Sequence, residues 1–123
     1  MKAVLIADPN PASSNAIFLW LAHKLGVKEI RQVSSGGCLA KQLEKAGAGI
    51  VLMDWSLPER PGPDFFQKIK EAEPAFELVI LSEKAEVSNL AEGYPATFVH
   101  KALSPENLLA VLKPLLDVGA EGK

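Results

Sequence analysis

Four polar residues each come directly after an apolar run of the chain. The pairs are "AVLIA" (3–7) with Asp8, "GIVLM" (49–53) with Asp54, "ELVIL" (77–81) with Ser82 and "ATFVH" (96–100) with Lys101. A carboxylate can attack phosphorus when a divalent cation offsets the charge of the phosphoryl oxygens. A second carboxylate helps to hold such a cation, which prefers oxygen ligands. An ammonium group and a hydroxyl group would then bind the phosphoryl oxygens, so these four residue types together suit phosphoryl acceptance.

The apolar runs are typical of buried parallel strands, because three of them are almost unbroken in hydrophobicity. A fifth run, "EIRQV", occupies 29–33. Segments of helical character alternate with the runs, and they cover 11–25, 34–46, 63–72, 84–92 and 104–116. Five strand–helix repeats with right-handed crossovers predict an α/β fold, a three-layer sandwich around a five-stranded parallel sheet. Such sheets bind ligands beyond the carboxyl ends of their strands, so the four polar residues should meet at one edge.

Two of the helical segments have apolar residues on more than one face. In 11–25 the core-facing residues are expected to be Ile17, Phe18, Leu21 and Leu25, which leaves Leu19 and Trp20 pointing elsewhere. In the last helix the inward residues are expected to be Leu108, Val111, Leu112 and Leu115, with Leu109 and Leu116 widening the stripe. A wide stripe suits a docking surface, a dimer interface or local packing equally well.

Composition limits the class of protein. The chain has 123 residues, 48% of them hydrophobic and 23% charged, which fits one globular domain. A net charge of −2 without a basic cluster argues against direct nucleic-acid binding. No apolar run is long enough to span a membrane, and Asp8 ends the first run too early for a signal peptide. Cys38 is the single cysteine and is expected to be a small buried or half-buried side chain; a reducing, cytoplasmic location follows. We expect the domain to cover 1–118 and a flexible tail or linker stub to cover 119–123.

Three motifs, in their order and spacing, resemble the response-regulator receiver domain of two-component signalling. "VLMDWSLPERPG" is similar to the family's acceptor aspartate, which is followed by a Leu/Met-Pro turn and a glycine. "VILS" resembles the strand that ends in Thr or Ser, and "FVHK" resembles an aromatic residue placed before a lysine. The resemblance covers nearly the whole chain and implies a flavodoxin-like sandwich.

The resemblance also implies a role for each polar residue. Asp54 would receive a phosphoryl group from a histidine on a kinase or phosphotransfer partner. Asp8 would belong to the acid pair that binds Mg²⁺ together with Asp54 and the backbone carbonyl of Ser56. Lys101 and Ser82 would contact the phosphoryl oxygens.

A switch is implied as well. Ser82 would move toward the phosphoryl group while the ring of Phe98 swings inward, a two-state change biased by one local charge. The domain would therefore be a phosphoacceptor and not an enzyme with a separate substrate. Its partners would be a histidine kinase or histidine phosphotransfer protein, and the last helix offers a surface for a homodimer.

The sequence departs from the family pattern at three points. Pro9 stands where a second adjacent acid is usual, which should weaken Mg²⁺ binding, and Asn10 could supply an oxygen only if the loop bends differently. Ala102 stands where a cis-proline is usual, so either the bond is trans and Lys101 moves or strain is tolerated. Only 19 positions separate Ser82 from Lys101, so the helix between them must be short or irregular.

These departures leave two functions open. The domain is either phosphorylated with lower metal affinity, or it is a degenerate pseudo-receiver that signals by protein binding alone. The presence of Asp54, Lys101 and Ser82 favours phosphorylation. A plain turn role is the alternative for Asp54, since Asp is common in turns. A haloacid-dehalogenase-like phosphatase is excluded because Ser56 stands where its second acid should be.

Overall fold

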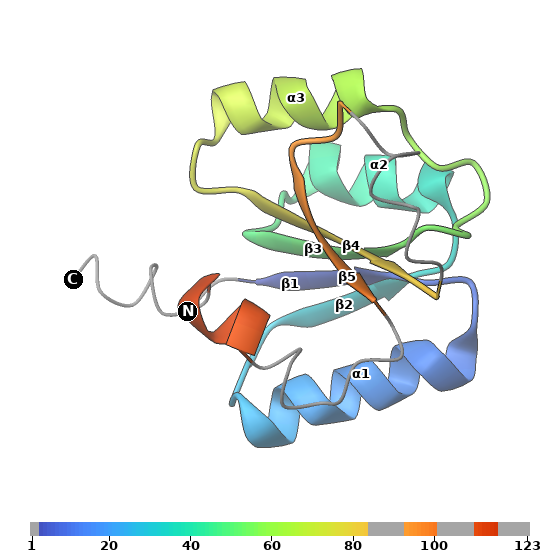
Figure 1. Ribbon diagram of the computed structural model, residues 1–123, viewed down its shortest axis with the longest axis vertical. Coiled ribbons are helices and arrows are strands. Elements are labelled where there is room, and N and C mark those ends of the chain that lie inside the picture. The colour runs from blue at the N-terminus through green and yellow to red at the C-terminus, as the bar shows by residue number, and fades with distance from the viewer. Residues whose placement is uncertain (1–2, 84–92, 101–109, 116–123) are drawn as a thin grey trace.

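The computed structural model describes residues 3–83, 93–100 and 110–115, which form a parallel sheet with helices on both faces (Figure 1). The five strands are β1 (Val4–Ala7), β2 (Ile30–Val33), β3 (Ile50–Asp54), β4 (Glu77–Ser82) and β5 (Ala96–His100). Their spatial order is β2-β1-β3-β4-β5. The helices are α1 (Pro11–Lys24), α2 (Gly36–Lys45) and α3 (Pro63–Ala72), and 110–115 are helical too. The predicted α/β sandwich is confirmed. The predicted helix at 84–92, the start of the last helix and the boundary at 118 lie outside the described residues.

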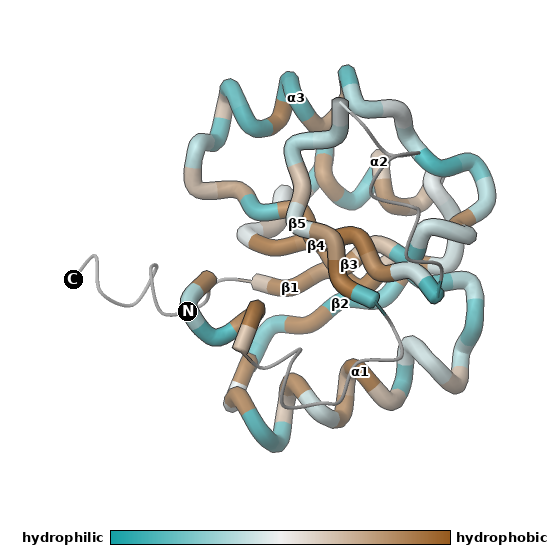
Figure 2. The backbone as a smooth tube through the Cα atoms, in the orientation of Figure 1, coloured by the Kyte–Doolittle hydropathy of each residue, from teal (hydrophilic) through white to brown (hydrophobic). Residues whose placement is uncertain are grey.

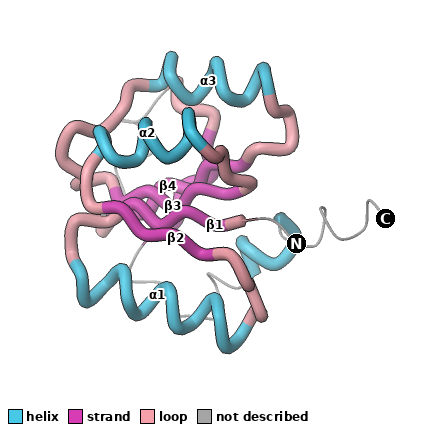
Figure 3. The backbone as a smooth tube through the Cα atoms, turned by 180° about the vertical axis from the view of Figure 1, so that it is seen from behind, coloured by secondary structure: helices cyan, strands magenta, loops and turns pink. Residues whose placement is uncertain are grey.

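The sheet divides the core into two layers (Figure 3). One layer lies under α2 and α3 and contains Leu5, Leu39, Met53 and Phe66. The other lies under α1 and residues 110–115 and contains Ile6, Leu21, Leu52 and Leu112. Along β1 and β3 successive side chains alternate between the two layers, so both faces of these strands are apolar. The central strands accordingly form the most hydrophobic part of the tube in Figure 2.

Helix α1 starts at a well-defined cap and packs with a broad apolar face. The side chain of Asn10 accepts the backbone N–H groups of Ala12 and Ser13 at 2.9 and 3.2 Å, which fixes the start of the helix. Leu21 is buried, as predicted, and Leu19 is 54% exposed. Trp20 was expected to point elsewhere, but it is half-buried against the core under α1.

Among the described residues, no helix is long and apolar enough to cross a membrane.

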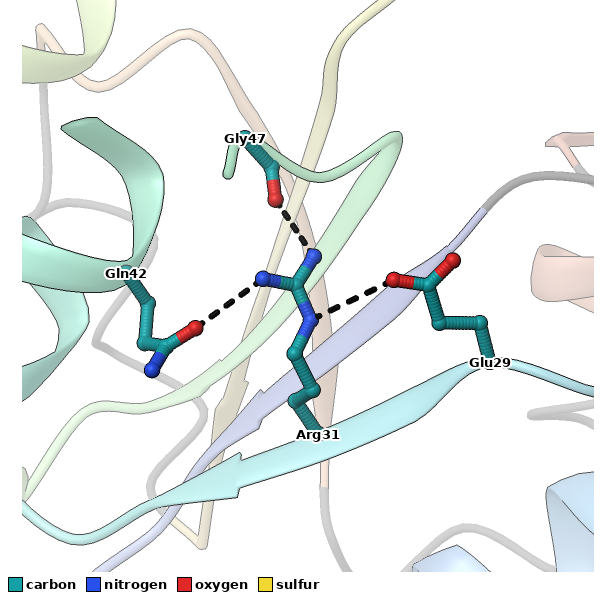
Figure 4. A network of polar contacts seen from close by, with 4 residues as sticks. All are labelled: Glu29, Arg31, Gln42 and Gly47. Carbon is teal, nitrogen blue, oxygen red and sulfur yellow. Dashed lines mark hydrogen bonds and ion pairs between the residues drawn. The ribbon is translucent and has the colours of Figure 1, made fainter. Parts of the chain in front are cut away.

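Arg31 of the edge strand β2 forms hydrogen bonds to the carboxyl end of helix α2 and to Gly47, which follows it (Figure 4). The guanidinium donates to Gln42 Oε1 at 2.9 Å and to the carbonyl of Gly47 at 2.5 Å. Arg31 Nε also lies 3.7 Å from Glu29 Oε2. Gly47 ends the helix with φ +68°, a conformation that glycine adopts without strain. A cation at this end also complements the partial negative charge of the helix terminus.

Candidate functional site

The strand register brings three of the predicted polar residues to one edge of the sheet. Ala7 pairs with Met53, so Asp8 follows β1 at the level of Asp54 on the neighbouring strand. Asp54 pairs with Leu81, and Ser82 is the next residue of β4. The carboxyl ends of β1, β3 and β4 therefore present two carboxylates and a hydroxyl side by side. Lys101 and Ala102 follow β5 and lie outside the described residues.

These three side chains are buried, which is unusual for polar groups at the ends of strands. Asp8 is 4% exposed, Asp54 6% and Ser82 8%. In the described part of the chain, Ser14 is the other buried polar side chain, and its hydroxyl accepts a hydrogen bond from Gln32 at 2.7 Å. A carboxylate removed from water is unfavourable unless polar partners replace the water. The burial of both acids therefore requires a polar surrounding built by the fold.

Local turns supply part of that surrounding. Asp54 Oδ1 accepts two hydrogen bonds from Ser56, one from the backbone N–H at 2.8 Å and one from the hydroxyl at 2.6 Å. Asp8 Oδ1 accepts the backbone N–H of Asn10 at 2.8 Å. All three are charge-assisted bonds, which are stronger than neutral ones. Each carboxylate thus has one oxygen held by the residue two positions later.

The donor set suits a hard cation such as Mg²⁺, although it contains fewer acids than usual. Asp8, Asp54 and the backbone carbonyl of Ser56 offer oxygen ligands, and Mg²⁺ commonly completes its shell with water and phosphoryl oxygens. Within the described residues no group of three or more His, Cys, Asp or Glu side chains is arranged to hold a metal. Asn10 does not replace the missing acid, because its side-chain oxygen caps α1. Pro9 has no oxygen in its side chain.

The segment 55–62 after Asp54, named here the acceptor loop, is packed tightly against α2. The N–H of Gly36 donates to the carbonyl of Pro58 at 2.7 Å. A Cβ at Gly36 would lie 1.7 Å from the carbonyl oxygen of Glu59, so only glycine allows this approach. Glu59 itself has φ +56°, a rare conformation for a residue other than glycine. The helix predicted over 34–46 begins at Gly36, with Ser35 as its cap.

The acceptor loop also holds a cluster that sequence reasoning missed. The guanidinium of Arg60 stacks over the Trp55 ring, 3.6 Å from its centroid, and the ring of Tyr94 makes a T-shaped contact with the same ring at 5.7 Å between centroids. Arg60 Nη1 donates to the carbonyl of Trp55, and Tyr94 donates its hydroxyl to the carbonyl of Pro61 at 2.7 Å. The only sequence signal was an arginine and a tryptophan within one loop, which does not indicate that they stack. The cluster joins the loop to the residues just before β5.

Phe98 lies beside β4, and Cys38 departs from its expected burial. Phe98 is half-buried and packs against the core under α2 and α3, with Ile80 as its neighbour on β4. Ser82 pairs with His100, two residues beyond Phe98. Cys38 was expected to be buried or half-buried, but it is exposed in the first turn of α2. A shallow cleft of about 390 Å³ lies between Cys38 and Asp8.

Comparisons with known proteins agree with this geometry. The family model described as "Response regulator receiver domain" matches residues 4–113. The transcriptional activator protein ExaE of Pseudomonas putida is 23% identical over 116 residues, covering 92% of this chain and 54% of that protein. The chain thus spans about half the length of this curated relative.

Solved structures share the fold. A CheY-like receiver domain protein from Methanospirillum hungatei has a TM-score of 0.76 at 22% identity, covering 100% of this chain and 99% of that one. RcsB from Salmonella enterica, solved on promoter DNA with the phosphomimetic BeF3⁻, has a TM-score of 0.75 at 22% identity, covering 95% of this chain and 61% of that one. With the strand order, the buried acids and a family match over residues 4–113, the chain belongs to the response regulator receiver domain family of two-component signal transduction.

Proposed function

We propose that this receiver domain accepts a phosphoryl group on Asp54 and passes on a conformational change. The observation that carries this proposal is the burial of Asp8, Asp54 and Ser82 at one edge of the sheet. A fold that needed only a turn after β3 would leave such an acid in water, where it is most stable. Two buried acids on adjacent strand ends are instead suited to a cation, and the Ser82 hydroxyl beside them is suited to a phosphoryl oxygen.

The chemical step is a displacement at phosphorus. An oxygen of Asp54 attacks the phosphorus of a phosphohistidine, the P–N bond breaks, and its electron pair leaves with the imidazole. Asp8, Asp54 and the backbone carbonyl of Ser56 would hold Mg²⁺, which when bound would offset the charge on the phosphoryl oxygens. Ser82 donates its hydroxyl to one phosphoryl oxygen, and Lys101 pairs with another. Movement of Ser82 then allows Phe98 to change its packing beside β4. The domain acts as a phosphoacceptor rather than as an enzyme with a separate substrate.

The phosphoryl donor is a histidine kinase or a histidine phosphotransfer protein. Leu19, 54% exposed on α1, offers an apolar contact on the helix that begins just after Asp8. A homodimer through the last helix has less support. In the described stretch, Leu112 is buried and Val111 and Leu115 pack against the core, while Leu109 and Leu116 lie outside the described residues.

A degenerate receiver that works by binding alone is the second candidate, and a specific observation favours it. Pro9 replaces the second acid, and the side-chain oxygen of Asn10 is committed to the cap of α1. Two acids instead of three bind Mg²⁺ less tightly, because each carboxylate adds charge attraction. The two candidates differ in one measurable event, the covalent modification of Asp54.

The test is intact-mass spectrometry after incubation with Mg²⁺ and acetyl phosphate. The proposal expects a gain of one phosphoryl group that is absent in Asp54→Asn and is reduced when Mg²⁺ is chelated. Pro9→Asp should raise the apparent affinity for Mg²⁺, because it returns a carboxylate to the site.

The controls separate the two candidates. No gain in the wild type at high Mg²⁺, with a gain in Pro9→Asp, would assign the chain to the degenerate class and identify Pro9 as the cause. No gain in either protein, with acetyl phosphate or with a phosphorylated histidine phosphotransfer protein, would refute phosphoryl acceptance.

A further inference from the structure

One peptide group lies between a guanidinium group and the Asp54 carboxylate. The N–H of Ser56 donates to Asp54 Oδ1 at 2.8 Å. The carbonyl of Trp55, which belongs to the same peptide group, accepts a hydrogen bond from Arg60 Nη1. A peptide group is planar, and its C=O and N–H point in opposite directions. A contact that fixes the carbonyl of Trp55 therefore also fixes the direction of the N–H that holds Asp54.

Arg60 is itself held in place, so it can act as a fixed support. Its guanidinium stacks over the Trp55 ring at 3.6 Å. Both of its neighbours in the chain are anchored. The carbonyl of Glu59 packs against Gly36, and the carbonyl of Pro61 accepts a hydrogen bond from the hydroxyl of Tyr94 at 2.7 Å. Among the described residues, Arg60 Nε is one of two buried side-chain nitrogens without a hydrogen-bond partner. Leaving a charged donor unsatisfied is unfavourable, so the observed position is maintained by the stacking and by the bond to Trp55.

We propose that Arg60 is a positioning residue for the phosphoacceptor, acting on Asp54 through the peptide group between Trp55 and Ser56. A cation on the carbonyl oxygen polarises the peptide and strengthens its N–H as a donor. Asp54 Oδ1 is thereby held, and because a carboxylate is planar the direction of its other oxygen is set as well. This inference rests on the proposed function and extends it, since transfer depends on the alignment of the attacking oxygen with phosphorus.

A purely structural role for Arg60 predicts a different result. Stacking on Trp55 could stabilise the acceptor loop without affecting Asp54. Arg31 provides a matched control, because its guanidinium also donates to a backbone carbonyl, that of Gly47, and its Nε is also buried without a hydrogen-bond partner among the described residues. Gly47 precedes β3 and lies near the amino ends of the strands, at the other edge of the sheet from Asp54.

The first test examines the unphosphorylated protein by ¹H–¹⁵N NMR. Arg60→Met keeps an unbranched apolar chain against Trp55 and removes the donor. The Ser56 amide proton should move upfield and exchange with solvent about tenfold faster in this variant, because one hydrogen bond is weakened. Arg60→Lys should restore part of the effect, since it retains a charged donor without the planar stack. Arg31→Met should change Ser56 exchange only as far as global stability changes.

The second test measures the rate of phosphorylation by acetyl phosphate at saturating Mg²⁺. Arg60→Met should lower the maximal rate about tenfold or more while the half-saturating concentration of acetyl phosphate stays constant. An unchanged Ser56 amide in a folded Arg60→Met would overturn the inference. A second contrary result needs no variant. If the Arg60 side-chain resonances of the wild type lack the upfield shift that the Trp55 ring should cause, the inference is overturned. If the wild type accepts no phosphoryl group, the proposed function fails, and the NMR comparison still decides the role of Arg60.

Discussion

Replacing Gly36 by alanine should separate helix α2 from the acceptor loop. The new Cβ would lie 1.7 Å from the carbonyl oxygen of Glu59, 2.3 Å from its carbonyl carbon and 3.0 Å from the nitrogen of Arg60. All three are backbone atoms, so no side-chain rotation relieves the clash. The Glu59 carbonyl must retreat by about 1.7 Å to reach ordinary van der Waals contact. That movement also breaks the hydrogen bond from Gly36 to Pro58.

The expected magnitude follows from three contributions. Overpacking costs about 1–3 kcal/mol, and the lost hydrogen bond costs about 1 kcal/mol. The higher helix propensity of alanine offsets at most about 1 kcal/mol of this loss of stability. Gly36→Ala should therefore lower the free energy of unfolding by about 2 kcal/mol, and Tm by about 8 °C for a chain of this size.

Gly37→Ala is the matched control. Its nearest contact is the end of a flexible side chain, Glu59 Oε1 at 3.0 Å, which can rotate away. We expect its stability to stay within about 0.5 kcal/mol of the wild type. Urea denaturation followed by circular dichroism measures both. Equal stability of the two variants would refute the tight contact between α2 and the loop.

Three further substitutions give distinct outcomes. Asn10→Ala should lower the free energy of unfolding by about 1 kcal/mol through loss of the α1 cap, as measured by urea denaturation. Tyr94→Phe should cost about 1 kcal/mol in the same assay, because the carbonyl of Pro61 loses its donor while the ring contacts remain. Phe66→Ala should cost about 3–5 kcal/mol, since Phe66 is fully buried and stacks with Phe76 at 6.5 Å, and thermal unfolding should show the loss.

Each of these outcomes has a clear contrary result. Asn10→Ser keeps a capping oxygen and should stay near wild-type stability; equal losses in the serine and alanine variants would argue against the cap. A Tyr94→Phe variant as stable as the wild type would mean that the hydroxyl bond contributes nothing. A loss below about 1 kcal/mol in Phe66→Ala would contradict a tightly packed core under α3.

The central strands β1, β3 and β4 were predictable because they are buried on both faces. Uninterrupted apolar runs such as "IVLM" leave few alternatives to a central parallel strand, and β3 begins and ends within one residue of its prediction. The same runs predicted that Asp8, Asp54 and Ser82 meet at one edge of the sheet. Each of these residues lies at or directly after the end of a strand, and the ends of parallel strands lie together.

Other features depend on contacts between distant segments and were not predictable from local patterns. Leu19 and Trp20 are neighbours in the uninterrupted apolar stretch 16–22 of α1, so periodicity could not assign the half-buried residue. Cys38 was expected to be buried or half-buried because cysteine side chains usually are, whereas its position in the first turn of α2 exposes it to solvent. The role of Asn10 as a cap and the stacking of Arg60 on Trp55 both require knowledge of how the loops turn.

The exposure of Cys38 has a practical consequence. The chain contains one cysteine, and it lies two residues from the glycine that touches the acceptor loop. A fluorophore or spin label attached to this thiol would report motion at the junction of α2 and the loop without any engineered substitution. Labelling chemistry directed at thiols has a single target here, so the signal from a donor–acceptor pair with Trp55 or Trp20 could be followed in the acetyl phosphate test of the proposed function. The molecule thus carries its own attachment point beside the acceptor loop.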